Sequence, residues 1–106
     1  MQNRIDATID MARAEREALR WILLSALWYG RPYGATEHVL LMTARDVMLR
    51  STADQVRAEL CSLEKRGLVA IGKGGPVWWA ELTADGESLV EYRADCPPDI
   101  ARPPRW

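Results

Sequence analysis

The stretch from Leu49 to Val69 constrains the fold more than any other part of the chain, because it holds both a start signal and a stop signal for one helix. Thr52 precedes Gln55 by three residues, the spacing of a capping box in which each side chain binds the other residue's backbone amide. A helix should therefore begin near Ala53. Its apolar residues then recur at intervals of four and three: Val56, Leu60 and Leu63. This spacing indicates one narrow stripe that faces a core.

The end of this helix leads directly into a predicted β-hairpin. Gly67 follows a basic pair that suits the negative end of the helix dipole, and it can supply the left-handed residue that terminates the helix. Residues 68–71 (Leu-Val-Ala-Ile) form a short β-forming run, residues 72–76 (Gly-Lys-Gly-Gly-Pro) are rich in turn residues, and residues 77–82 form a second β-forming run. We therefore predict a helix over residues 53–66 that is followed by a strand, a turn and a strand.

Three further helices complete the predicted secondary structure. Asn3 begins a long first helix, whose apolar residues keep mostly helical spacing as far as Trp28. Thr36 can cap a second helix, which should end between residues 44 and 48. Thr83 can cap a last helix directly after the hairpin, with acidic residues in its first turn.

Length and composition allow one modest core. The chain has 106 residues, of which 48% are hydrophobic, so we predict a single, mainly α domain with a small β-hairpin (α+β) over residues 1–93. Residues 94–106 contain two Pro-Pro pairs, which favour an extended conformation and predict a Pro-rich C-terminal tail. This tail could be disordered, or it could be a docking peptide that ends in Arg105 and Trp106.

The sequence shows no signal for export or for membrane insertion. Residues 1–6 are polar and lack the apolar core of a secretory leader. The longest apolar run, residues 21–29, is far shorter than the roughly 20 residues that cross a bilayer. Cys61 and Cys96 lie in unrelated settings without CxxC spacing, as expected of two free thiols in a reducing compartment. We therefore expect a cytoplasmic protein without a membrane partner.

Two linked motifs carry a resemblance to a known family. The first reads Val56-x-x-x-Leu60-x-x-Leu63-Glu64-x-x-Gly67-Leu68-Val69, and the second, after the hairpin, reads Leu82-Thr83-x-x-Gly86. Together they resemble the winged helix-turn-helix family over roughly residues 19–92, which implies the order helix, helix, helix, strand, wing, strand, helix. The run from Thr52 to Leu60 and the Arg102-Pro103 tail further resemble small winged-helix proteins of Mu-like transposable phages and prophages. This resemblance implies a phage-associated DNA-binding or assembly role.

The helix over residues 53–66 is the predicted reader of duplex DNA. When its apolar stripe faces inward, Asp54, Ala58, Cys61 and Lys65 turn outward at about 100° per residue. A winged-helix protein of this kind would insert that face into the major groove, as a transcriptional regulator or phage accessory factor does. The candidate DNA contacts are base-reading Gln55 and Arg57, the small Ala58 and Ser62, and the phosphate-binding candidates Arg50, Ser51, Thr52, Lys65 and Lys73.

The charge distribution leaves a second function open. The net charge is −1, which is not the basic bias expected of a protein that binds nucleic acid. Acidic residues outnumber basic ones after residue 80, away in sequence from the predicted recognition helix. The same small face of mixed polarity could instead bind a protein. The alternative is therefore a winged-helix module for protein-protein interaction, such as an adaptor in phage assembly, without DNA binding.

Two further features predict interaction surfaces. The first helix is longer than a winged-helix core needs, so Ile5 and Ile9 should project beyond the domain, where they could form a homodimer or fold back on the C-terminal segment. Alternation along residues 77–82 places Trp78 on the buried face and Trp79 on the exposed one. An exposed Trp79 could be an interface anchor, a platform for stacking bases, or partial cover over the small hairpin.

No catalytic or metal-binding constellation is evident in the sequence. His38 is the only histidine and has no cysteine or second histidine at metal-ligand spacing. Nothing in the sequence holds it beside a nucleophile. The glycine cluster at residues 72–75 lacks the GxxxxGK[ST] pattern and joins two strands, so it is not a phosphate-binding loop. We therefore predict a protein that is not an enzyme and uses no cofactor or metal.

Overall fold

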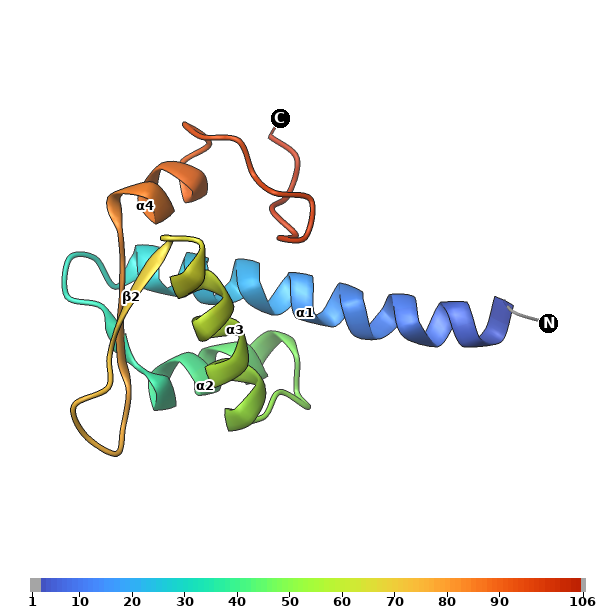
Figure 1. Cartoon of the computed structure of the whole chain (residues 1–106), viewed down its shortest axis with the longest axis horizontal. Helices are drawn as coiled ribbons and strands as arrows, with labels where there is room; N and C mark the ends of the chain where they lie inside the picture. The colour runs from blue at the N-terminus through green and yellow to red at the C-terminus, as the bar shows by residue number, and fades with distance from the viewer. Residues whose placement is uncertain (1–2, 106) are drawn as a thin grey trace.

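The computed structural model describes the backbone of residues 3–105 and the side chains of residues 10–105. Within this part of the chain it contains four helices and one three-stranded antiparallel sheet of order β1-β3-β2, an α+β fold. The elements in chain order are α1 (Asn3–Tyr29), β1 (Ala35–Thr36), α2 (Glu37–Val47), α3 (Ala53–Lys65), β2 (Val69–Gly72), β3 (Trp79–Leu82) and α4 (Ala84–Val90). The N-terminal part of α1 projects well beyond the other elements (Figure 1).

Both predicted ends of α3 are confirmed. The Thr52 hydroxyl accepts a hydrogen bond from the Gln55 amide at 3.2 Å, and the Gln55 side chain accepts one from the Thr52 amide at 3.0 Å. At the other end Gly67 has a φ of 75°. The Gly67 amide donates to Glu64 O and the Leu68 amide to Leu63 O, at 2.9 and 3.0 Å. This pair of bonds is a Schellman motif, which satisfies the last helical carbonyls.

The two other predicted caps are also confirmed. The Thr36 hydroxyl accepts from the Val39 amide at the start of α2, and the Thr83 hydroxyl accepts from the Gly86 amide at the start of α4. Gly86 lowers the helix propensity of α4, but a Cβ atom at this position would lie 2.2 Å from Leu68 O. A residue without a side chain is therefore needed where α4 crosses the start of β2.

The sheet differs from the predicted hairpin in two respects. β2 and β3 pair as expected, with Val69 opposite Leu82, but β3 begins at Trp79 rather than at residue 77. The strand starts late because the Trp78 backbone binds the start of α2: its amide donates to the Glu37 carboxylate, and its carbonyl accepts from the Glu37 amide. The second difference is β1, which pairs with the other edge of β3 and places Ala35 opposite Ala80. A two-residue strand has too few residues to show a pattern in sequence.

The hydrophobic core lies between the helices and one face of the sheet. The predicted inward stripe of α3 is confirmed, because Val56, Leu60 and Leu63 are almost fully buried. The other elements add buried residues from α1 (Leu19, Leu23, Leu24, Leu27), α2 (Leu40, Ala44), β2 (Val69), β3 (Ala80), α4 (Leu89) and the C-terminal segment (Ile100).

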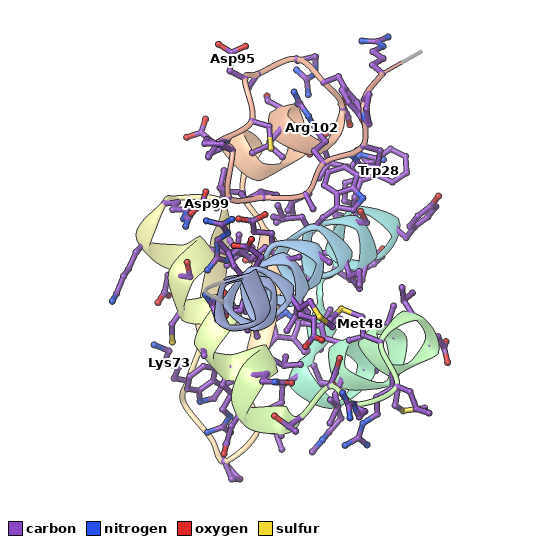
Figure 2. The ribbon with its side chains drawn as sticks, turned by 90° about the vertical axis from the view of Figure 1, so that its right-hand side faces the viewer. Trp28, Met48, Lys73, Asp95, Asp99 and Arg102 are labelled. Atoms are coloured by element: carbon purple, nitrogen blue, oxygen red, sulfur yellow. The ribbon has the colours of Figure 1, made fainter. Side chains whose placement is uncertain are left out.

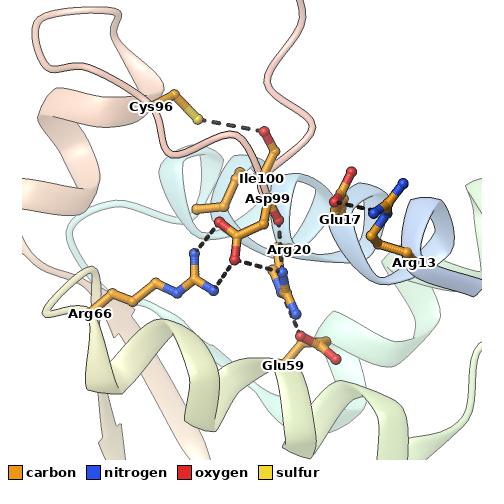
Figure 3. A network of polar contacts seen from close by, with 8 residues as sticks. All are labelled: Arg13, Glu17, Arg20, Glu59, Arg66, Cys96, Asp99 and Ile100. Carbon is orange, nitrogen blue, oxygen red and sulfur yellow. Dashed lines mark hydrogen bonds and ion pairs between the residues drawn. The ribbon is translucent and has the colours of Figure 1, made fainter. Parts of the chain in front are cut away.

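The C-terminal segment packs on the domain and is not a free tail. Ile100 is only 4% exposed. Asp99 binds the Arg66 guanidinium through both carboxylate oxygens, with one distance of 2.6 Å, and its backbone carbonyl accepts from Arg20 at 2.8 Å (Figure 3). Arg20 also binds Glu59 at 2.7 Å. This network of alternating charges joins α1, α3 and the C-terminal segment.

A second set of bonds holds the end of this segment against α4. Arg102 donates to the carbonyls of Leu89 and Ala94, both at 2.9 Å. The Tyr92 hydroxyl donates to Pro103 O at 2.6 Å. Residues 94–105 are therefore ordered, and the alternative of a disordered tail does not hold for them. Side chains of the domain bind two backbone carbonyls of this segment, since Arg20 donates to Asp99 O and Tyr92 to Pro103 O.

Candidate functional site

The side chains that join α2, α3 and the β2–β3 loop (residues 73–78) form the most constrained polar cluster on the predicted DNA-binding side. Glu37 is the first residue of α2, and its side chain is only 8% exposed. Arg57 on α3 donates from Nε and Nη2 to the two carboxylate oxygens of Glu37, both at 2.7 Å. Such a two-point pair fixes direction as well as distance. We call Glu37, Arg57, Pro76 and Trp78 the clamp.

The clamp also holds the β2–β3 loop. Arg57 Nη2 donates to Pro76 O at 2.9 Å, and the Trp78 amide donates to the Glu37 carboxylate at 2.5 Å. The Arg57 guanidinium lies 4.3 Å from the centre of the Trp78 ring, and Lys73 Nζ lies 4.9 Å from it. Trp78, which we expected on the buried face, is therefore only partly buried and lies beneath two cations.

The contacts within the clamp shift the pKa values of Glu37 and Arg57. The Arg57 guanidinium, through its hydrogen bonds, lowers the pKa of Glu37 from 4.5 to about 2, and the bond from the Trp78 amide adds to the effect. Glu37 in turn raises the pKa of Arg57. Both groups are therefore charged at neutral pH, and the ion pair is present there.

Two residues that we predicted to contact DNA are engaged inside the protein. Ser51 is 4% exposed, and its hydroxyl donates to Met48 O at 2.8 Å. It closes the α2–α3 turn and does not present its hydroxyl to a phosphate, which corrects the prediction. Arg57, a predicted base reader, has its fork bound to Glu37 and Pro76. Local sequence patterns do not reveal this pair, because Glu37 and Arg57 are 20 residues apart.

The other predicted contacts lie at the surface of α3 and its neighbours. Thr52, Gln55, Ala58 and Lys65 are exposed on α3 and its cap, and Ser62 is partly exposed. The capping box occupies the Thr52 hydroxyl and the Gln55 carbonyl oxygen, so the Gln55 NH2 group remains as a donor.

Three cations border this face. Arg50 in the α2–α3 turn and Lys65 at the end of α3 are exposed, and neither forms an ion pair with another described side chain. Lys73 at the start of the loop lies 3.5 Å from Glu64 and keeps a 45% exposed side chain. A surface pair at this distance is weak, so Lys73 can exchange Glu64 for another anion.

Three acidic residues of the C-terminal part lie on α4 or directly after it, not on α3 or the loop. Asp85 and Glu87 are on α4, and Asp95 follows it. Figure 2 shows Asp95 at the top of the molecule and Lys73 in its lower half. The uneven charge distribution in the sequence therefore corresponds to two different surfaces.

The predicted interaction residues are distributed over three places. Trp79 is 44% exposed, which confirms its predicted side of β3. The guanidinium of Arg105 lies 5.8 Å from the Tyr92 ring centre, at the C-terminal segment. Trp106 and the side chains of Ile5 and Ile9 lie outside the described residues. Of the described residues, Trp79 is therefore on β3 and Arg105 is beside Tyr92, on different elements.

A groove of about 660 Å³ lies where the projecting part of α1 leaves the domain. Its apolar lining comes from three elements: Ala12 and Leu19 on α1, Met48 and Leu49 at the α2–α3 turn, and Ala58 on α3. Charged side chains stand at its edge, among them Glu15, Arg16, Arg50 and Asp54. The sequence did not reveal this groove, because the groove depends on the direction in which α1 leaves α3 and the α2–α3 turn.

No family model matches this chain, and no curated protein matches it. Within the described residues, no helix is long and apolar enough to cross a membrane. No group of three or more His, Cys, Asp or Glu side chains among them is placed to hold a metal ion.

Proposed function

We propose that this chain is a winged-helix protein that binds duplex DNA without catalysis, with α3 in the major groove and the β2–β3 loop as the wing. The clamp is the observation that carries the proposal. One buried carboxylate, Glu37, fixes α2, α3 and the loop in a single arrangement. A reader that approaches DNA with a helix and a wing gains affinity from such preorganisation, because less conformational freedom is lost on binding.

The side chains beside the clamp suit contact with a phosphate backbone. Lys65 and Lys73 stand on α3 and the loop, and Arg50 stands at the α2–α3 turn. A Cβ atom added at Gly74 or Gly75 would meet no atom within 4 Å, so the loop tip can approach another surface closely. Half to two-thirds of the hydrogen bonds in protein–DNA interfaces go to phosphate and sugar, and cations of this kind supply many of them.

The proposal assigns Arg57 a positioning role. Its guanidinium holds the loop at Pro76 and lies over Trp78, so it sets where Lys73 stands relative to α3. Base reading would then fall to small or polar groups on α3, of which Gln55 and Ser62 can donate hydrogen bonds. In a phage setting, such a cytoplasmic protein would act as a transcriptional regulator or as an accessory factor.

A salt series with duplex DNA tests this function. Affinity should fall linearly with salt on logarithmic axes, and the double variant Lys65→Ala, Lys73→Ala should flatten that slope by about two units. The matched control is Arg93→Ala, Arg105→Ala, which removes the same charge from the α4 side and should leave the slope unchanged. Equal effects of the two double variants would mean that only net charge matters, and would contradict the proposed surface.

Exposed apolar side chains favour a second candidate function, a protein-interaction module without DNA contact. They lie along α2 and its C-terminal turn: Val39 (52% exposed), Met42 (68%), Val47 (71%) and Leu49 (81%). Large exposed apolar side chains gathered on one element are typical of protein interfaces. A folded wild-type protein that fails to bind duplex DNA at low salt would exclude the first function and leave this one.

A further inference from the structure

The groove between α1 and α3 is a candidate docking site at the edge of the predicted DNA-binding face, and the apolar side chains of α1 that line it have no role in DNA binding. It is about 660 Å³ in volume, and its apolar lining includes Ala12, Leu19, Leu49 and Ala58. The alanines at positions 12 and 58 keep the two helix backbones accessible to a third chain segment. An apolar floor with a charged edge is the kind of surface that accepts the apolar side of an amphipathic helix.

The segments of this chain that the structure describes do not fill the groove. α1 is one continuous helix over Asn3–Tyr29, so its first turns cannot bend back onto the wall that the helix itself forms. The C-terminal segment is fixed elsewhere, because the Ala101 amide binds Glu17 O and Arg20 binds Asp99. None of the described residues of that segment lines the groove. An occupant of the groove would therefore come from another molecule.

The sequence of α1 supplies a suitable occupant. Ile5 and Ile9 precede Ala12 by intervals of four and three residues, and the same spacing, interrupted by Arg16, reaches Leu19 and Leu23 in the core. In a helix this spacing puts the positions along one side. The stripe that packs inside the domain thus continues along the projecting part of α1, which leaves the other elements behind (Figure 1).

We propose that the groove accepts the projecting α1 turns of a second copy of this chain, and that two copies exchange these turns about a two-fold axis. Each copy then supplies one projecting helix and one groove, so the contact closes at two copies and does not propagate. The charges permit this pairing. The groove lining carries Glu15, Asp54, Arg16 and Arg50, two of each sign, and a third carboxylate, Glu59, which is already paired with Arg20. Four charged residues of the projecting turns also balance: Arg4, Arg13, Asp6 and Asp10.

The first test compares two neighbouring positions of α1 in the full chain. Ile9→Glu puts a charge on the proposed apolar side, and sedimentation velocity should show a shift from dimer to folded monomer. Met11→Glu introduces the same charge two residues away, at a side chain that is 65% exposed and does not line the groove, and should keep the dimer. A monomeric wild-type protein at all concentrations, or equal dissociation by both variants, would overturn the proposal.

The second test asks whether the groove receives the helix, or whether two α1 helices merely pair with each other. Leu49→Glu changes the far wall of the groove at a side chain that is 81% exposed, so folding should be preserved, which circular dichroism can verify. Docking into the groove predicts loss of the dimer in this variant. An unchanged dimer would place the partner helix elsewhere and would contradict the proposed site.

A charge exchange completes the test. Ala58→Arg should also dissociate the dimer, because it places a charge at the groove wall. When this variant is mixed with Ile9→Glu, each heterodimer has one unaltered contact and one contact that pairs glutamate with arginine, so association should return. Failure to associate in the mixture would contradict the exchange of turns. Arg50, Gln55 and Ala58 belong both to this groove and to the predicted DNA-binding face, so a docked helix would cover part of that face. Lys65 and Lys73 do not line the groove, and their variants therefore report on DNA binding without altering the dimer contact.

Discussion

Arg57 and Glu37 form a two-point ion pair in which each carboxylate oxygen accepts one hydrogen bond at 2.7 Å. The same carboxylate accepts from the Trp78 amide, and the same guanidinium donates to Pro76 O. One pair of side chains therefore fixes the position of α2, α3 and the β2–β3 loop together. The loop has few other contacts to hold it, since Gly74 and Gly75 stand in open space.

Glu37→Gln should destabilise the protein and loosen this loop. The amide removes the negative charge from a side chain that is 8% exposed, while Arg57 remains partly solvated at 37%. We expect a loss of about 1–3 kcal/mol in the free energy of unfolding, between the values for exposed and buried pairs. Urea titration measures the loss, and hydrogen exchange at the Trp78 amide reports the loop. Glu81→Gln, at an exposed position of β3, is the control and should change neither.

The same pair predicts a dependence of stability on pH. The folded-state pKa of Glu37 is about 2, below its ordinary value of 4.5, so its contribution is fully present above about pH 4.5. The contribution should disappear as the pH falls from about 4.5 to about 2, where Glu37 becomes protonated in the folded protein. Other carboxylates with lowered pKa, such as Asp99 and Glu91, act in the same direction. The measurement is therefore the difference in stability between wild type and Glu37→Gln, which should narrow toward low pH.

The helix boundaries could be predicted because their signals are local. The capping box at Thr52 and Gln55, and the left-handed Gly67, depend on residues within one or two turns of each other. The buried stripe of α3 follows from helical spacing alone, and Val56, Leu60 and Leu63 are buried as expected.

The features that define the candidate sites could not be predicted in this way, because they depend on contacts between distant residues. Glu37 and Arg57 are separated by 20 residues, and Arg20 and Asp99 by 79. In both pairs, the neighbouring residues in the sequence do not indicate which residue will be the partner. The groove likewise depends on the angle at which α1 leaves the domain, and β1 exists only because β3 offers it a free edge.

Gly86→Ala should destabilise the protein although it raises helix propensity. The added Cβ would lie 2.2 Å from Leu68 O and 2.7 Å from a methyl carbon of Leu82, so α4 must shift away from β2. Overpacking of this kind costs typically about 1–3 kcal/mol. The matched control is Gly74→Ala, where the new methyl group meets no atom within 4 Å and the unfolding midpoint should barely change. A stabilised Gly86→Ala variant would mean that α4 does not cross β2 this closely.

Ile100→Ala should release the C-terminal segment from the domain. Ile100 is 4% exposed and packs with the core. If the segment stays in place, shortening this side chain to alanine should lower the free energy of unfolding by about 2–5 kcal/mol. If the segment is released instead, the loss of stability should be smaller, because residues 94–105 can detach from the domain while the helices remain packed. Limited proteolysis separates the two outcomes, since a released segment exposes the peptide bond after Arg93 to trypsin. Arg105→Ala is the control, because this side chain is exposed and should leave cleavage at Arg93 unchanged. Rapid trimming of the wild-type segment would contradict its packing on α1, and equal resistance of Ile100→Ala would show that the Asp99–Arg66 pair is sufficient to hold it.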